Sequence, residues 1–168
     1  MPLKRNMAFV LVLASGTLPY LADARSEIRS GAVLELKGFL REDQLFGRAG
    51  YVRIKTIDRC KKAVDGYVTE RPILSDSQFR FDQASVAVTE PDTPQELVRI
   101  VIPVTEEGGK ILQAWTGQNV GRGLALLFHG AVVWVPTISD RFAGPIILQG
   151  CYTRADADRI VSELKAVA

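Results

Sequence analysis

The stretch LVRIVIPVTEEGGKILQAWTG, residues 97–117, contains the change of pattern that decides the fold. Its first part, 97–104, is a run of mostly β-branched apolar residues, which predicts a strand. Thr105 is then a good helix N-cap, and the two glutamates after it stand in the first turn, where carboxylates complement the helix dipole. We therefore predict a strand followed by a helix that ends near Gly117. The residues expected to face a sheet from this helix are Ile111, Leu112 and Trp115.

The residues after this helix predict a hairpin, a short strand and a second helix. Two apolar runs within 124–135 are separated only by His129-Gly130, a connection short enough for a β-hairpin. A short apolar run over 146–148 predicts another strand. Thr153 then caps a final helix, with an aspartate at its third position. The apolar stripe of that helix consists of Ala157, Ile160, Val161 and Leu164.

The residues before this region are expected to form strands. Apolar and polar residues alternate over 32–37 and 50–58, which is typical of strands buried on one face. Residues 78–89 are expected to form one further strand, and Pro91 and Pro94 to bracket the turn into the next strand. Strands and helices alternate without strict βαβ repetition. The predicted class is therefore α+β, with a largely antiparallel sheet packed with two helices.

Composition limits the chemistry available to the chain. With 168 residues and 47% hydrophobic residues, it has the size and composition of one globular domain. A formal charge of +2 is too balanced to indicate nucleic acid as a partner. One His and two Cys are too few for a structural zinc site, and a histidine-based catalytic triad would have to use His129. We therefore expect neither a metal nor a cofactor.

The amino terminus, 1–24, has the features of a cleaved signal peptide. Lys4 and Arg5 precede an apolar stretch over 7–21, and small residues stand at the positions that a signal peptidase reads before a cut after Ala24. The stretch is shorter than the roughly 20 residues that span a bilayer, although an uncleaved anchor is the alternative. We expect a periplasmic or secreted protein without stable membrane insertion after cleavage.

Export would place Cys60 and Cys151 in an oxidising compartment, where two cysteines most simply form one disulfide. Cys60 follows a predicted strand and Cys151 precedes a predicted helix, so the bond would join two distant parts of the domain. Two buried free thiols are the alternative.

The second half of the chain carries an ordered set of short motifs. They are Thr105-Glu106-Glu107-Gly108, Thr116, Asn119-Val120-Gly121-Arg122, Leu124-Ala125-Leu126, Gly130, Val132-Val133, Pro136, Ile138, Gly150 and Tyr152-Thr153, with Pro72-Ile73-Leu74-Ser75 upstream as a looser match. In this order and spacing the chain resembles the head subdomain in the first extracytoplasmic loop of SecD, a protein-export factor also found fused as SecDF. A structural reason is available for each matched position, so none requires a catalytic role.

Together with the predicted signal peptide at 1–24, the resemblance implies added amino-terminal strands at 25–70 and a head-like subdomain at 71–168. The signal peptide, the resemblance and the scarcity of catalytic groups together predict a secreted, non-catalytic domain that contacts polypeptides or an envelope protein, and the resemblance links it to protein export. The transmembrane helices that carry the proton-coupled work in SecD have no counterpart in this match, so a proton-driven motor is not implied.

Three residues are candidates for contacting a partner: Trp134, Arg141 and Phe142. Strict alternation would place Val132 and Trp134 on one face of their strand and Val133 and Val135 on the other. The SecD family tends to have a small polar residue at the position of Trp134. An exposed Trp there would be an anchor for a partner, and cover by the chain itself is the alternative. Arg141 and Phe142 lie in the loop before the last predicted strand, where exposed basic and apolar groups would recognise a partner, and a plain loop is the alternative.

Other functional readings remain open from the sequence. Paired carboxylates, Asp76 with Asp82 or Asp140 with Asp156, would serve a hydrolase if the fold brought them together in a cleft. A dedicated structural or inhibitory partner of one envelope protein is a third class. The segment Gly121-Arg122-Gly123 follows a predicted helix and precedes a predicted strand. A dinucleotide-binding loop follows a strand and precedes a helix, so phosphate binding is not expected here. The SecD family usually has an acidic residue where this chain has His129. His129 is a plain turn residue in one interpretation and a pH-sensitive or catalytic group in the other.

Overall fold

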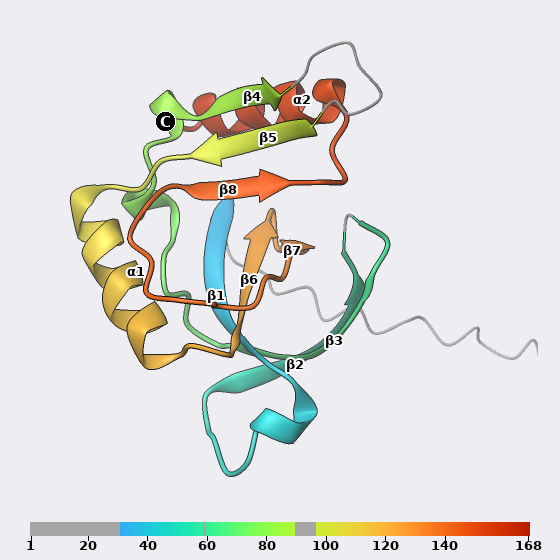
Figure 1. The fold of residues 1–168 in the computed structure, drawn as a ribbon, viewed down its shortest axis with the longest axis vertical. Coiled ribbons are helices and arrows are strands. Elements are labelled where there is room, and N and C mark those ends of the chain that lie inside the picture. Colours follow the sequence, from blue (N-terminus) through green and yellow to red (C-terminus); the bar gives the residue numbers. More distant parts are fainter. Residues whose placement is uncertain (1–30, 59, 90–96) are drawn as a thin grey trace, which may run out of the picture.

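A computed structural model describes residues 31–58, 60–89 and 97–168. These residues form two antiparallel β-sheets and two α-helices, which confirms the predicted α+β class (Figure 1). The predicted signal peptide and the turn between Pro91 and Pro94 lie outside the described residues. The strands and helices are β1 (Leu34–Leu40), β2 (Tyr51–Ile57), β3 (Ala63–Thr69), β4 (Ser85–Thr89), β5 (Leu97–Ile102), α1 (Glu106–Gln118), β6 (Gly123–Phe128), β7 (Ala131–Trp134), β8 (Ile146–Gln149) and α2 (Arg154–Lys165).

The larger sheet has the strand order β2-β3-β1-β6-β7 and is built around β1. Strand β1 pairs with β6 from Leu34 to Phe39, but with β3 only at Phe39 and Leu40. The β2–β3 hairpin therefore leaves β1 after a short contact, and in Figure 1 it curves away from the rest of the sheet.

Strand β1 is buried along its whole length, so the prediction of a strand buried on one face was wrong for it. Leu34 and Leu36 contribute to one hydrophobic core, and Phe39 contributes to a second core on the opposite face. The polar residues on this second face predicted that it is exposed to solvent. Glu35 and Lys37 are instead buried as a pair, with 3.8 Å between Lys37 Nζ and Glu35 Oε2. Burial of such charges is tolerated because they compensate one another.

The smaller sheet has the order β4-β5-β8, and its buried face joins the first core. Helix α2 lies behind β4 and β5 in Figure 1 and contributes its predicted stripe to that core. Thr153 caps α2 as predicted, because its Oγ1 accepts a hydrogen bond from the N–H of Asp156 at 3.1 Å. Both sheets and both helices thus share one large core.

The segment 78–89 is not one strand. A short 3-10 turn at Asp76–Gln78 overlaps its first residue, and a second one at Phe81–Gln83 lies within it, before β4 begins. Phe79 and Phe81 are both buried and their rings stack with centroids 5.7 Å apart, so their two-residue spacing imitated a strand. The prediction also missed β3, whose single glycine and mixed polar residues weaken the alternating pattern.

Helix α1 begins as predicted, with Thr105 Oγ1 accepting from the N–H of Gly108 at 3.0 Å. Its buried face, however, consists of Gly108, Gly109, Leu112 and Thr116, and Ile111 is 36% exposed. The prediction that Ile111 faces a sheet was therefore wrong. The buried face of α1 is centred on two glycines, which carry no apolar side chain and so give no signal in the sequence pattern. Trp115 is half-buried against the first core, and its ring covers Gly38 of β1.

Cys60 and Cys151 form the expected disulfide, with their Cα atoms 5.1 Å apart. Cys60 lies in the turn between β2 and β3, and Cys151 lies between β8 and α2. The alternative of two free thiols is therefore wrong. The bond ties the end of the curved hairpin to the smaller sheet, across a sequence separation of 91 residues.

Candidate functional site

The β6–β7 hairpin turns at His129 and Gly130, as predicted, and both have a positive φ, of 48° and 76°. Glycine adopts this backbone without cost, whereas for His129 it is uncommon. The ladder contains a β-bulge, because Leu127 pairs with Val132 but Leu126 pairs with Trp134. Val133 is the extra residue.

This bulge overturns the predicted orientation of Trp134. Val133 and Trp134 both pack on the first core, whereas Val132 and Val135 both contact the second core. A two-residue alternation cannot place neighbours on one face, and the inserted residue is the physical reason that they share it. Trp134 is half-buried on this side.

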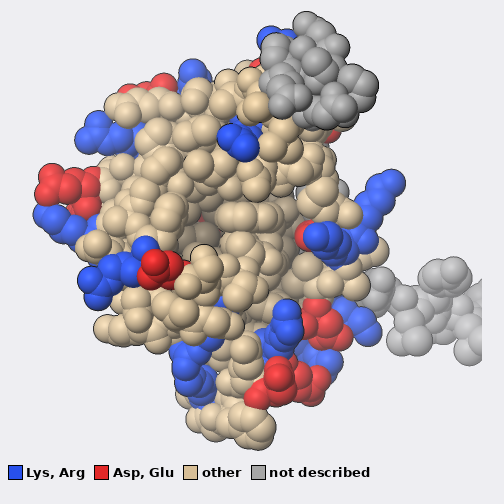
Figure 2. All heavy atoms as spheres, viewed as in Figure 1, with Lys and Arg blue, Asp and Glu red and all other residues tan. Residues whose placement is uncertain are grey.

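The three predicted contact residues, Trp134, Arg141 and Phe142, line one pocket of about 290 Å³. Its walls come from the end of β7, the loop that follows it and the beginning of β8, with Leu36 of β1 and Leu124 of β6 also in the lining. Most of these side chains are apolar. Figure 2 shows that this face of the molecule is hollowed near its middle and that mainly uncharged residues surround the hollow. The sequence did not predict that Trp134 lies in the same pocket as Arg141 and Phe142.

The wall that carries Arg141 and Phe142 is held against α1. Thr116 Oγ1 accepts from the N–H of Phe142 at 2.9 Å and donates to the carbonyl of Leu112 at 2.8 Å. A Cβ on Gly109 would lie 3.0 Å from the carbonyl oxygen of Ala143, so only glycine gives the loop full room there. Sequence reasoning missed Thr116 and Gly109 as supports, because their partners lie more than 25 positions away.

The residues between β7 and Arg141 are also fixed. The N–H of Leu124 donates to Pro136 O at 2.9 Å, and the N–H of Ile138 donates to Arg122 O at 2.8 Å. The N–H of Gly121 is bonded to Ile138 O, and the Arg122 guanidinium is bonded to the Asn119 side chain. The Gly121-Arg122-Gly123 segment therefore uses these groups to hold the pocket loop.

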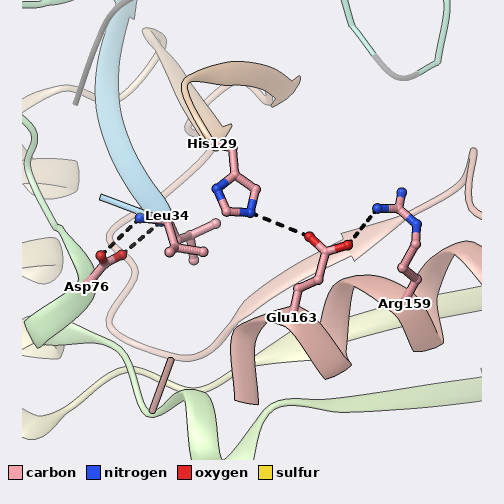
Figure 3. A network of polar contacts seen from close by, with 6 residues as sticks. Leu34, Asp76, His129, Arg159 and Glu163 are labelled. Carbon is pink, nitrogen blue, oxygen red and sulfur yellow. Dashed lines mark hydrogen bonds and ion pairs between the residues drawn. The ribbon is translucent and has the colours of Figure 1, made fainter. Parts of the chain in front are cut away.

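Three of the four carboxylates considered for hydrolysis accept hydrogen bonds within the fold, and the fourth, Asp82, is exposed. Asp76 accepts hydrogen bonds from the backbone N–H groups of Val33 and Leu34, at 2.9 and 2.8 Å (Figure 3). Asp156 accepts from the hydroxyl of Thr153 at 2.8 Å. Asp140 is the one of these carboxylates in the pocket lining, and it accepts from the N–H of Arg141 at 2.6 Å.

His129 lies on the surface beside α2. Its Nε2 is 3.4 Å from a carboxylate oxygen of Glu163, whose other oxygen accepts from Arg159 at 2.7 Å (Figure 3). This network is outside the lining of the pocket. The described part of the chain has no cluster of three or more His, Cys, Asp or Glu side chains arranged to hold a metal ion.

A model of the SecDF P1 head subdomain matches residues 55–168. The chain belongs to this family. The fold of the chain is also similar to two solved structures. One comes from a study of SecDF as a membrane component that enhances protein export, with 19% identity and a TM-score of 0.53. The other is SecDF in its super-membrane-facing form, with 18% identity and a TM-score of 0.56.

Each of these likenesses covers 80% of this chain, and it spans 62% of the first solved chain and 19% of the second. No curated protein matches the chain. Among the described residues of this P1 head, none of the helices combines the length and apolar character needed to cross a bilayer.

Proposed function

We propose that this chain is an extracytoplasmic, non-catalytic module of protein export that binds extended apolar segments of polypeptides in the pocket between β7, β8 and their connecting loop. The observation that carries the proposal is the convergence of Trp134, Arg141 and Phe142 on that pocket. Membership of the SecDF P1 head family supports the link to export. The disulfide supports an oxidising compartment, periplasmic or secreted.

The size of the pocket favours side chains as its occupants. A volume of about 290 Å³ is at the lower limit of pockets that hold small molecules, so it would accept one or two side chains of a polypeptide. Trp and Phe are effective anchors because they bury a large area at low entropic cost. An apolar pocket without a dense set of polar groups would discriminate weakly between sequences, which suits a binder of many clients.

Access to the pocket is available from solvent. Phe142 is 39% exposed and Ile147 is 41% exposed, and both contribute to the lining. Trp134 is half-buried and forms a wall, so part of its ring is already covered by the chain itself. A bound segment would cover the remaining exposed area of these side chains, which is the source of its binding free energy.

Site-specific photocrosslinking in the native envelope tests this function. A benzoylphenylalanine probe at Phe142 is expected to give adducts with many exported polypeptides. The matched control is the same probe at Phe46, an exposed Phe outside the pocket lining, which is expected to give few adducts. Equal adducts at the two positions would contradict the proposal. One dominant adduct at Phe142 would instead support a dedicated envelope partner.

A further inference from the structure

Strand β8 ends the smaller sheet, and the pocket lies beside it. On one side β8 pairs with β5 from Ile146 to Gln149. On its other side no strand of the described residues pairs with it. Ile146 and Ile147 are at once part of this strand and part of the pocket lining. An unpaired strand edge therefore borders the apolar pocket.

The direction of the backbone groups of β8 follows from the neighbouring strand. Just beyond β5, Pro103 O accepts from the N–H of Arg80, and the N–H of Thr105 donates to Gln78 O. Both partners lie in the segment that leads into β4. In an extended chain the backbone groups of alternate residues point to the same side. Odd-numbered residues of β5 therefore point their N–H and C=O groups toward β4.

Even-numbered residues of β5 must then bond to β8. Ile100 is opposite Leu148, and Ile102 is opposite Ile146. These two residues of β8 direct their backbone groups to β5, so the intervening Ile147 and the terminal Gln149 direct theirs to the open edge. No hydrogen bond from a described residue outside the sheet reaches these two. The edge thus offers two N–H donors and two C=O acceptors in a row.

The surroundings of this edge define the chemistry of its occupant. The exposed side chains of Ile147 and Phe142 make the approach apolar. Arg99 is the cross-strand neighbour of Gln149 at one end of β8, and Arg141 lies in the loop before its other end. Asp140 stands beside Arg141 in the same lining and balances its charge, so Arg99 is the cation that favours an acidic residue, and disfavours a basic one, at its end of the occupant.

We propose that a bound polypeptide adds to the open edge of β8 as an antiparallel or parallel fourth strand, with one apolar side chain in the pocket between Trp134 and Phe142. This inference rests on the proposed function and assigns its mode of binding. Main-chain hydrogen bonds to Ile147 and Gln149 would supply affinity that is independent of the client's sequence, and the pocket would select an apolar residue.

The test uses the full chain and a fluorescein-labelled peptide of sequence SETVFVTES, followed by fluorescence anisotropy. A second peptide carries N-methyl groups on alternate amides of its central residues, which removes donors and leaves the side chains unchanged. In the protein, Gln149→Pro removes one outward N–H, and Gln149→Ala is the matched control for loss of the side chain. Phe142→Ala reports on the pocket. Circular dichroism verifies that each variant is folded.

We expect N-methylation to weaken binding about tenfold or more, and Gln149→Pro to weaken it about threefold to tenfold, because each removes main-chain hydrogen bonds. Gln149→Ala should bind normally. Replacing both glutamates of the peptide by lysines should weaken binding at low salt. Strand addition would be overturned if the N-methylated peptide bound normally and Gln149→Pro bound the unmodified peptide normally, while Phe142→Ala lost binding. The proposed function would still stand in that case. Absence of binding by every peptide would count against both.

Discussion

Removal of the Cys60–Cys151 disulfide should destabilise the domain strongly. The bond closes 91 positions of sequence, which include every strand from β3 to β8. The chain-entropy model gives a loss of about 4.6 kcal/mol at 25 °C for a loop of this length. For a domain of this size, that loss corresponds to a decrease of roughly 15 °C in Tm. Because native domains are stable by only about 5 to 15 kcal/mol, the remaining margin would be small.

The measurement is urea unfolding of the double variant Cys60→Ser, Cys151→Ser, followed by circular dichroism. Wild-type protein in excess reductant is the control, and its free energy of unfolding should agree with that of the variant within about 1 kcal/mol. Hydrogen exchange should also be faster in the β2–β3 hairpin, since only Phe39 and Leu40 of β1 pair with β3. A loss below about 1 kcal/mol would contradict this prediction, because the bond would then constrain little of the unfolded chain.

Three further predictions, two of them with matched control substitutions, test the pocket and the carboxylates. Phe142→Ala should weaken binding of an unfolded polypeptide roughly tenfold in a titration, with the free energy of unfolding nearly unchanged because this side chain is partly exposed. Thr116→Val leaves the Phe142 N–H without its acceptor and should cost about 1 to 3 kcal/mol in urea unfolding and weaken binding as well, whereas Thr116→Ser should restore both. Asp76→Ala should lower the free energy of unfolding by about 1 to 3 kcal/mol, because the Asp76 carboxylate accepts hydrogen bonds from two backbone N–H groups at the start of β1, including that of Leu34. The control Asp82→Ala should change the free energy of unfolding by less than about 0.5 kcal/mol. Equal losses in the two variants would contradict a structural role for Asp76.

Local signals predicted a large part of the fold. Thr105 and Thr153 were recognised as helix caps from the carboxylates that follow them, and His129-Gly130 was recognised as a tight turn. Each of these features depends on neighbours within about four residues, so the sequence displays it directly. The pairing of Cys60 with Cys151 was also accessible, because the chain has only two cysteines.

Features that depend on distant partners were not accessible. The bulge at Val133, which turns Trp134 toward the first core, leaves no mark in an apolar run of similar residues. Burial of β1 on both faces arises only when the β2–β3 hairpin curves away and a second core forms around Phe39. Separate arguments from the sequence pointed to Trp134 and to the pair Arg141 and Phe142. The sequence could not show that Thr116 holds the loop of Phe142 in place, because the two residues lie far apart along the chain.

Binding of an extended polypeptide in the pocket should cover Trp134. In the Trp115→Phe variant, Trp134 is the remaining tryptophan of the chain, and its emission reports on its surroundings. Titration with a permanently unfolded protein that contains no tryptophan, reduced and carboxymethylated ribonuclease A, should give a saturable blue shift that Phe142→Ala abolishes. An emission spectrum that stays unchanged, or a shift that Phe142→Ala leaves intact, would contradict the claim.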